Sequence, residues 1–380
     1  MKHIISKSCA DAQAYIVPFR AGSPRGVSIA PEMDAAVDLA INGSFGGNLG
    51  ETYAMTLPVG DKLTSIILLG LGADRLSVRD IHTKAAQAFK QAKQLGAKHV
   101  AIMLDQVSEL SESAELFGAL ARLPQLVGYT NSGLKSNPEN KSFEQITFVT
   151  AADGLDAALS EAVATARGTI IARKLCNLRS NEQTPQSLAE DAAALGKEYG
   201  FDVQLFDKAA IEELGMESFL SVARGAHNTP PVLIVMRYLN GGDSPRIGLV
   251  GKGIVYDSGG YSIKTTPGMK NMFDDMGGAA AVIGAMTAVA DQKLRANVIG
   301  VIAACENKIA ADAYVPGDII GSMSGKTIEV ISADAEGRLT LADAVTYIQR
   351  KESCQFVADI ATLTGSAKTA VGKYSAAVLT

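Results

Sequence analysis

The order of apolar and polar positions predicts strands that alternate with helices along the chain. An apolar run over 65–72 is followed by a helical pattern over 78–95, a second apolar run over 99–104 and a helical pattern over 111–123. Later segments repeat this order. Helices are expected over 155–175, 186–199, 278–291 and 339–350, and strands over 203–206, 232–237, 247–252, 298–305, 327–332 and 355–362.

This alternation predicts an α/β protein with two domains, each a mixed or mostly parallel sheet flanked by helices. A chain of 380 residues exceeds one ordinary domain, and its hydrophobic content of 47% is ample for two cores. We place the boundary near residue 160. The N-terminal α/β domain then covers 1–160 and the catalytic domain 161–380.

Charge and cysteine usage narrow the class of protein. The net charge of −5, with no block of Lys or Arg, disfavours a nucleic-acid partner. The apolar runs reach only strand length, and the residues after Met1 lack the unbroken apolar run of a secretory signal, so we expect no membrane contact. The cysteines lie far apart without a CxxC pair, which indicates reduced thiols and a cytoplasmic location; they are Cys9, Cys176, Cys305 and Cys354.

Charged residues follow the strand expected over 327–332. Asp334, Glu336 and Arg338 are each two positions apart, so an extended chain would direct them to one face. Two carboxylates held close together repel each other unless a cation neutralises them. The pattern therefore indicates a metal site whose oxygen ligands suit Mn, Zn or Mg.

A second charged segment follows the strand expected over 247–252. Lys252 ends that strand, Asp257 and Lys264 follow it, and Asp275 precedes the next helix. A lysine can ligate a metal only as a neutral amine, which a nearby cation and burial both favour. Four carboxylates balance two divalent ions when Lys252 is neutral, so the charge count favours a dinuclear hydrolase centre with a bridging water.

At these positions the sequence resembles the leucyl aminopeptidase family of metallopeptidases. The resemblance rests on Gly251-Lys-Gly-Ile-x-x-Asp-Ser-Gly-Gly260, Asp275-Met-Gly-Gly-Ala-Ala280 and Asp334-Ala-Glu-Gly-Arg-Leu339. The variants Tyr261-Ser-Ile-Lys264 and Ala367-Lys-Thr-Ala370 are most similar to the peptidase B branch. The family implies a metallo-aminopeptidase that removes N-terminal residues from peptides.

The resemblance also implies a role for each matching residue. It makes Asp257 and Glu336 bridging ligands, Lys252 and Asp275 ligands of one metal, and Asp334 a ligand of the other. Lys264 would polarise the scissile carbonyl, and Arg338 would hold a bicarbonate that acts as general base. The residues implied to line the substrate site are Met272, Thr362, Leu363 and Gly365. The family further implies a homo-hexamer whose active sites admit peptides.

Three departures from the family pattern carry expectations of their own. Ser332-Ala333 stands where the family usually has Asn-Thr, which we expect to loosen hydrogen bonding behind the site. Asp274 adds a negative charge beside the metals, which we expect to alter metal preference or reject acidic substrates. The chain ends at Thr380, where family members continue, so we expect a truncated catalytic domain whose own activity is in question.

Two other functions fit parts of this pattern. Another two-metal hydrolase, such as a phosphoesterase, would use the carboxylates but not Lys252 and Lys264 in these roles. A non-catalytic assembly or DNA-binding role, known in the same family, would need a basic surface stripe that the sequence does not indicate.

Overall fold

The computed structural model describes residues 1–26, 28–131, 133, 136 and 142–380. It divides into two compact units, Met1–Arg167 and Gly168–Thr380. The division lies within helix α6 (Asp156–Asn177), the helix that also contains the boundary expected after residue 160. Each unit has its own sheet and its own cores, and each is described separately below.

The first unit is built on a six-stranded sheet. Its strands are parallel except for β3, which pairs antiparallel with β4 as a hairpin. The spatial order is β1 (Lys2–Ser6), β6 (Gln145–Val149), β5 (His99–Met103), β2 (Ala14–Phe19), β4 (Lys62–Gly70) and β3 (Thr52–Val59).

Both faces of this sheet are covered. Side chains of successive strand residues point to opposite faces, so Ile67 of β4 enters the core under α3 (Ala86–Gln94) and α5 (Ala114–Gly128), whereas Leu68 enters the core under α1 (Pro31–Gly43). Short helical pieces complete the unit: α2 (Val78–Asp80), a π-helix (Ile81–Ala85), a 3-10 helix (Leu104–Gln106) and α4 (Glu109–Glu112).

The second unit is built on a five-stranded mixed sheet. Strand β9 pairs parallel with β10 and β13, and β8 pairs antiparallel with β10 and β7. The spatial order is β13 (Phe356–Ile360), β9 (Arg246–Asp257), β10 (Asn297–Asn307), β8 (Val232–Leu239) and β7 (Asp202–Phe206). The fold class expected from the sequence is confirmed.

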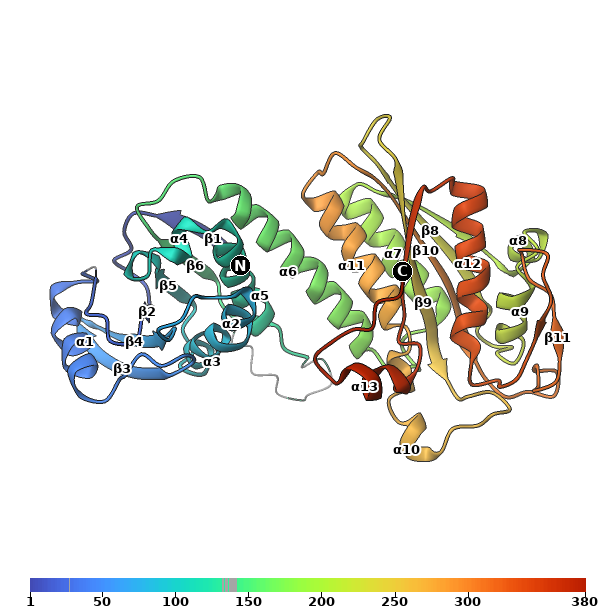
Figure 1. Cartoon of the computed structure of the whole chain (residues 1–380), viewed down its shortest axis with the longest axis horizontal. Coiled ribbons are helices and arrows are strands. Elements are labelled where there is room, and N and C mark those ends of the chain that lie inside the picture. The colour runs from blue at the N-terminus through green and yellow to red at the C-terminus, as the bar shows by residue number, and fades with distance from the viewer. Residues whose placement is uncertain (27, 132, 134–135, 137–141) are drawn as a thin grey trace. The chain divides into compact units, whose positions relative to one another are not determined.

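Helices cover the two faces of this second sheet, as Figure 1 shows. Ile234 of β8 packs into the core with α7 (Pro185–Tyr199) and α11 (Gly277–Asp291), and its neighbour Leu233 packs into the core with α9 (Glu217–Ala223) and α12 (Glu336–Glu352). The smaller elements are α8 (Lys208–Glu213), α10 (Thr266–Met269), a 3-10 helix (Met272–Asp274), the pair β11 (Ile319–Ile320) and β12 (Ile328–Glu329), and α13 (Gly365–Val371).

One local expectation is wrong. The strand expected over 327–332 is only Ile328–Glu329, and α12 begins at Glu336, where a carboxylate interacts favourably with the helix dipole. Residues two apart on a helix point in different directions. Glu336 is therefore buried and Arg338 exposed, and the two do not share the face that an extended chain would give them.

In the described part of the chain, no helix is both long enough and apolar enough to cross a bilayer.

Candidate metal centre

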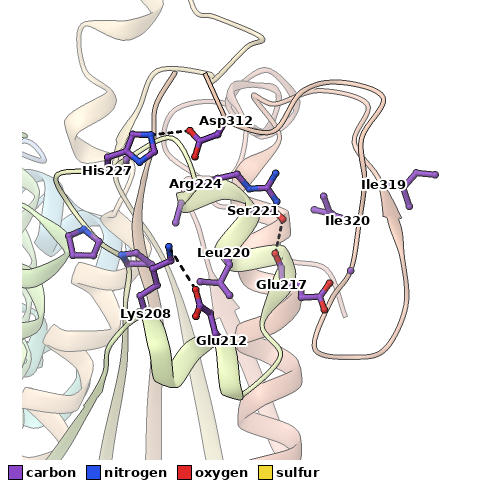
Figure 2. Close-up of a pocket in the computed structure, with 15 residues that line it drawn as sticks. Lys208, Glu212, Glu217, Leu220, Ser221, Arg224, His227, Asp312, Ile319 and Ile320 are labelled. Carbon is purple, nitrogen blue, oxygen red and sulfur yellow. Dashed lines mark hydrogen bonds and ion pairs between the residues drawn. The ribbon is translucent and has the colours of Figure 1, made fainter. Parts of the chain in front are cut away.

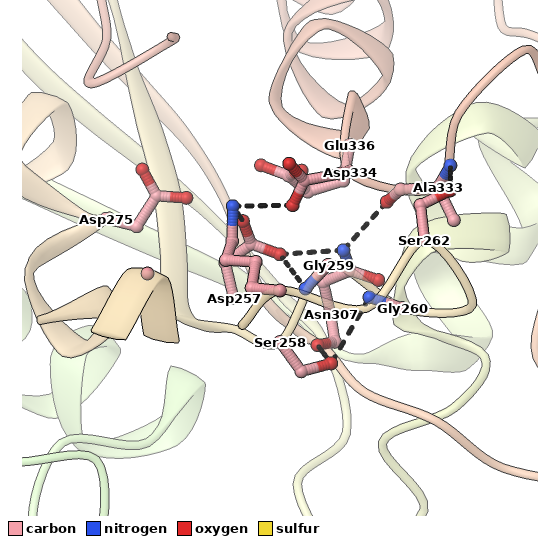
Figure 3. Close-up of polar contacts among 12 residues, drawn as sticks. Asp257, Ser258, Gly259, Gly260, Ser262, Asp275, Asn307, Ala333, Asp334 and Glu336 are labelled. Carbon is pink, nitrogen blue, oxygen red and sulfur yellow. Dashed lines mark hydrogen bonds and ion pairs between the residues drawn. The ribbon is translucent and has the colours of Figure 1, made fainter. Parts of the chain in front are cut away.

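Carboxylates and lysines from four segments of the second unit meet beside the end of β9 (Figure 3). Lys252 and Asp257 belong to β9, and Lys264 follows in the loop after it. Asp275 lies between the 3-10 helix and α11. Asp334 and Glu336 stand just before and at the first residue of α12. The structure thus brings together the six charged residues other than Arg338 that the sequence indicated.

The carboxylate of Asp257 is fixed through one oxygen and faces the cluster with the other. Its Oδ1 accepts hydrogen bonds from the Gly259 backbone and from Asn307 Nδ2, both at 2.8 Å. Its Oδ2 lies 2.8 Å from Lys264 Nζ. Lys264 Nζ also lies 2.5 Å from Asp334 Oδ1, so this ammonium bridges two carboxylates.

Lys252 makes a second bridge of the same kind. Its Nζ lies 2.7 Å from Asp275 Oδ2 and 2.8 Å from Glu336 Oε1, and the lysine side chain is only 2% exposed. Thr362 supports the bridge, because its hydroxyl donates to Asp275 Oδ1 at 2.8 Å and its carbonyl accepts from Lys252 Nζ at 3.3 Å. Asp275, like Asp257, is therefore anchored through one oxygen and presents the other to the cluster.

Burial and charged neighbours together shift the pKa of these groups. Burial raises the pKa of Asp275 to about 7, against the opposing pull of Lys252. The pKa of Glu336 is also raised, by burial first and then by the nearby Asp257 carboxylate. Burial alone would lower the pKa of Lys252, but its two carboxylate partners outweigh that effect and raise it. The same balance raises the pKa of Lys264.

The residues present fit divalent cations. Four carboxylates and two ammonium groups leave a formal charge of −2 when all are ionised. Oxygens of Asp257, Asp334 and Glu336 all lie within 4.8 Å of one another. Glu336 Oε2 is buried without a hydrogen-bond partner among the described residues. An orphaned buried carboxylate oxygen in a hard-oxygen cluster with excess negative charge is the environment that Mn, Zn or Mg neutralises.

The backbone beside Asp257 requires glycine, as the sequence indicated. Gly259 has φ +85°, and a Cβ at this position would lie 2.5 Å from the Ser262 carbonyl and 2.9 Å from Asp334 Oδ1. A side chain would therefore be strained and would crowd a candidate ligand.

The remaining predicted site residues make fewer contacts with the charged cluster. Arg338 is exposed in the first turn of α12 and forms no ion pair within the described residues. Met272 is half-buried at the start of the 3-10 helix, Leu363 is 41% exposed, and Gly365 begins α13. Only Thr362 in this group hydrogen-bonds to the charged cluster among the contacts of the described residues.

Sequence reasoning missed the residues that hold the Asp334 segment in place. The Ala333 carbonyl accepts from Asn307 Nδ2 at 2.9 Å and from the Tyr314 hydroxyl at 2.8 Å, and the Ala333 amide donates to Ser262 Oγ at 3.0 Å. The Ala333 peptide is thus bonded on both sides. Asn307 could have been identified from the sequence, because it is a polar residue that follows the apolar run over 298–305 at the expected end of a strand.

Gly337 is a second residue that sequence reasoning missed. A Cβ at this position would lie 2.6 Å from Lys252 Cε and 2.8 Å from Lys252 Nζ. The bare backbone of α12 therefore leaves the space in which the Lys252 side chain reaches Glu336.

The second unit also has a pocket away from these charged residues, shown in Figure 2. Its volume is about 530 Å³, and it is lined by residues of α8, α9 and the segment around Asp312 and Ile319. Two pairs of its lining side chains are in contact: Lys208 Nζ lies 3.8 Å from Glu212 Oε1, and His227 Nε2 lies 2.9 Å from Asp312 Oδ1. None of the predicted site residues lines this pocket.

The fold and the site together define a two-domain α/β protein with a carboxylate-rich candidate metal centre at the end of a central strand. The model of the cytosol aminopeptidase family catalytic domain matches residues 170–380, and that of the family's N-terminal domain matches residues 34–138. The chain therefore belongs to the cytosol aminopeptidase family.

Known proteins support this membership. The chain is 44% identical to a probable cytosol aminopeptidase of Clostridium perfringens, covering 88% of this chain and 70% of that protein. It is 38% identical to one of Azoarcus sp., covering 92% and 74% respectively. Among solved structures, the bottromycin maturation enzyme BotP in complex with Mn is similar with a TM-score of 0.80 and 27% identity, over 95% of this chain and 75% of that one.

These findings confirm the family and the aminopeptidase class expected from the sequence. The peptidase B branch and the truncation of the catalytic domain stay predictions.

Proposed function

We propose that this chain is a metallo-aminopeptidase that hydrolyses N-terminal residues from peptides and uses two divalent metal ions with a bridging water. The observation that carries the proposal is the division of the charged cluster into two bridges. Lys252 joins Asp275 to Glu336, and Lys264 joins Asp257 to Asp334. Each bridge puts one positive charge between two carboxylates, which is the electrostatic role that a bound cation fulfils.

The resemblance to the family implies the ligand set, and the closeness of the six charged side chains supports it. Asp257 and Glu336 would be shared by both ions, Lys252 and Asp275 would hold one, and Asp334 would hold the other. Manganese or zinc is the expected metal, with magnesium as a further candidate, and the similar BotP structure is a complex with Mn. When bound, two ions would supply an activated water and a Lewis acid for the scissile carbonyl.

The chain's own residues have distinct tasks in this proposal. Lys252 would ligate as a neutral amine, so it must release the proton that Asp275 and Glu336 stabilise at 2.7 and 2.8 Å. Lys264 is the cation that stays charged, and it would polarise the substrate carbonyl. Arg338, which is exposed and without an ion-pair partner among the described residues, is available to hold a bicarbonate as general base.

The substrate is a peptide with a free amino terminus. Met272, Thr362, Leu363 and Gly365 would line its groove. The hydrogen bonds of Thr362 to Lys252 and Asp275 support a groove beside these two residues. We further propose a homo-hexamer that works in the cytoplasm, with neither nucleic acid nor membrane as a partner. The names of the similar cytosol aminopeptidases support the location.

The test is cleavage of a panel of aminoacyl anilides by the metal-free chain after Mn, Zn or Mg is restored. We expect the chromophore to be released only when a metal is present. We expect no release by the Glu336→Ala variant, and none from an N-acetylated substrate. Equal cleavage of the acetylated substrate would refute exopeptidase action. No cleavage with any of the three metals would refute activity of this chain.

A further inference from the structure

A second group of metal-ligating side chains lies in the first unit. Cys9 and Asp11 belong to the loop between β1 and β2, and His99 is the first residue of β5. Cys9 Sγ lies 3.8 Å from Asp11 Oδ1 and 3.7 Å from His99 Nε2. His99 Nδ1 lies 3.7 Å from Asp11 Oδ1. One ligand atom from each residue falls within 4.8 Å of the others.

These separations suit three ligands of one zinc-class ion. Bond lengths of about 2.3 Å to sulfur and about 2.0 to 2.1 Å to nitrogen or oxygen put tetrahedral ligands about 3.3 to 3.6 Å apart. The contacts of Asp11 Oδ1 with Cys9 Sγ and with His99 Nδ1 need to close by only a few tenths of an ångström. The 3.7 Å contact of Cys9 Sγ is with the other ring nitrogen, Nε2, so the imidazole must also turn for one nitrogen to face both ligands. Cys9 and Asp11 contact opposite ring nitrogens of His99, as in a Cys-His-Asp nucleophile relay, but in such a relay the thiol and the carboxylate are separated by the imidazole and do not contact each other. Here Asp11 Oδ1 is as close to the sulfur as to the ring.

The backbone that carries these ligands is fixed. The side-chain carbonyl of Gln13 accepts hydrogen bonds from the backbone amides of Lys98 and His99 at 2.6 and 3.2 Å. The backbone amide of Gln13 donates to the His99 carbonyl at 3.0 Å. The hydroxyl of buried Tyr15 donates to the Cys9 carbonyl at 2.9 Å. Gln13 therefore ties the loop to the start of β5, and Tyr15 of β2 holds Cys9 on the other side of Asp11.

The imidazole is also oriented from its far side. His99 Nε2 lies 2.9 Å from Thr147 Oγ1 and 3.1 Å from Gln145 Nε2, both on β6. Metal-ligating histidines usually donate the N–H of their second ring nitrogen, which fixes the tautomer and the ring plane. Of these two neighbours only the Thr147 hydroxyl can accept, because the Gln145 amide group is itself a donor, so metal binding through Nδ1 requires a proton on Nε2 that is donated to Thr147 Oγ1. Nδ1 is then the nitrogen that faces Asp11.

We propose that Cys9, Asp11 and His99 bind one divalent ion of the zinc class at a site separate from the carboxylate cluster of the second unit. The sulfur, nitrogen and oxygen donors suit zinc or cobalt better than the hard-oxygen cluster does. Cys9 binds as the thiolate and its proton goes to solvent, and water completes the coordination. Burial raises the pKa of the Cys9 thiol, a penalty that a bound cation removes.

Cobalt is the probe that separates this site from the other. A Co²⁺–thiolate bond gives a near-ultraviolet charge-transfer band, whereas lysine and carboxylate ligands give none. The metal-free full chain is titrated with Co²⁺, and we expect one equivalent to produce the band. The band should be absent in Cys9→Ser, and should remain in Cys354→Ser, the matched thiol control, and in Glu336→Ala, which damages the other cluster.

Affinity gives an independent readout in case Cys9→Ser folds poorly. The side chain of Asp11 is 76% exposed, so Asp11→Asn should fold normally, and we expect it to weaken Zn²⁺ binding at least tenfold in competition with a chromophoric chelator. His99→Gln should weaken it similarly. The proposal is overturned by no charge-transfer band in the wild type, by a band that survives Cys9→Ser, or by a band that is lost in Glu336→Ala.

Discussion

Asn307 Nδ2 donates to Asp257 Oδ1 at 2.8 Å and to the Ala333 carbonyl at 2.9 Å. A single amide group at the end of β10 thereby joins the last residue of β9 to the residue before Asp334. Two candidate ligands that are far apart in sequence are thus held at a fixed separation by a residue that carries no charge.

We expect Asn307→Ala to weaken metal binding at the site of Asp257 and Asp334 at least tenfold and to lower kcat by a similar factor. The reason is that Asp257 loses a hydrogen bond that orients it, and such outer-shell partners commonly contribute 10 to 100-fold in affinity. The matched control is Asn297→Ala, which removes a buried asparagine with three hydrogen bonds from the other end of the same strand.

Both variants should lose about 1 to 3 kcal/mol of unfolding free energy, because each leaves buried polar groups unpaired. Only Asn307→Ala should change the metal affinity of the folded protein, measured by chelator competition. Equal metal affinities in the two variants would mean that Asn307 supports the fold and does not position Asp257.

The two lysines should differ in their effect on the metal-free protein. Lys252→Met leaves Asp275 and Glu336 facing each other in a site where both are buried, and loss of one partner of a buried ion pair costs about 3 to 5 kcal/mol. Lys264→Met leaves Asp334, which is 38% exposed and screened by solvent, and Asp257, which is buried but keeps its hydrogen bonds from Gly259 and Asn307. Urea unfolding in excess chelator should show the larger loss of stability for Lys252→Met. The reverse order would contradict the two-bridge description of the site.

The sequence predicted the α/β alternation of both units because buried strands and amphipathic helices leave strong periodic signals. Strands β1, β2, β3 and β6 of the first unit were missed. In β1 the pattern is short and partly polar, and the buried β2 is interrupted by Pro18 in the run Ala14-Tyr-Ile-Val-Pro-Phe19. The candidate ligands were found because motifs near strand ends are local in sequence. Asn307, Tyr314 and Ser262 were not, because their importance lies in hydrogen bonds to a peptide group, which the sequence does not show.

The Arg338 expectation illustrates a different limit. Its spacing from Asp334 and Glu336 was interpreted as an extended chain, but the helix starts three positions earlier than the apolar pattern indicated. Helix boundaries depend on the capping geometry of a few residues, and the apolar pattern does not encode that geometry.

Gly337→Ala should impair the metal centre without destabilising α12. Alanine favours a helix over glycine by about 1 kcal/mol, yet a Cβ here would lie 2.6 Å from Lys252 Cε, so the lysine side chain must move away from Glu336. We expect weaker metal binding and lower kcat. The control is Gly118→Ala within α5, where the nearest atom to the new Cβ is 4.0 Å away. Unchanged metal affinity in Gly337→Ala would show that the lysine has room to adjust.

His3 on β1 should make the first unit sensitive to acid. Burial, together with the charges of the N-terminus and Arg167, lowers the pKa of His3 from 6.5 to about 4, and its Nε2 is buried without a hydrogen-bond partner among the described residues. Between pH 6.5 and 4 the unfolded chain therefore binds a proton at His3 that the folded chain does not bind. The free energy of unfolding should therefore fall as the pH decreases from 6.5 to 4. Above pH 6.5, His3 should cause no loss of stability.

Because His3 is partly exposed, we expect a contribution of about 1 to 2 kcal/mol over that window. His3→Leu should flatten the pH dependence of unfolding, with its largest stabilisation relative to the wild type near pH 4. Urea unfolding followed by circular dichroism, in chelator so that metal loading does not vary with pH, measures the difference. An identical slope in the variant and the wild type would assign the acid sensitivity to groups other than His3.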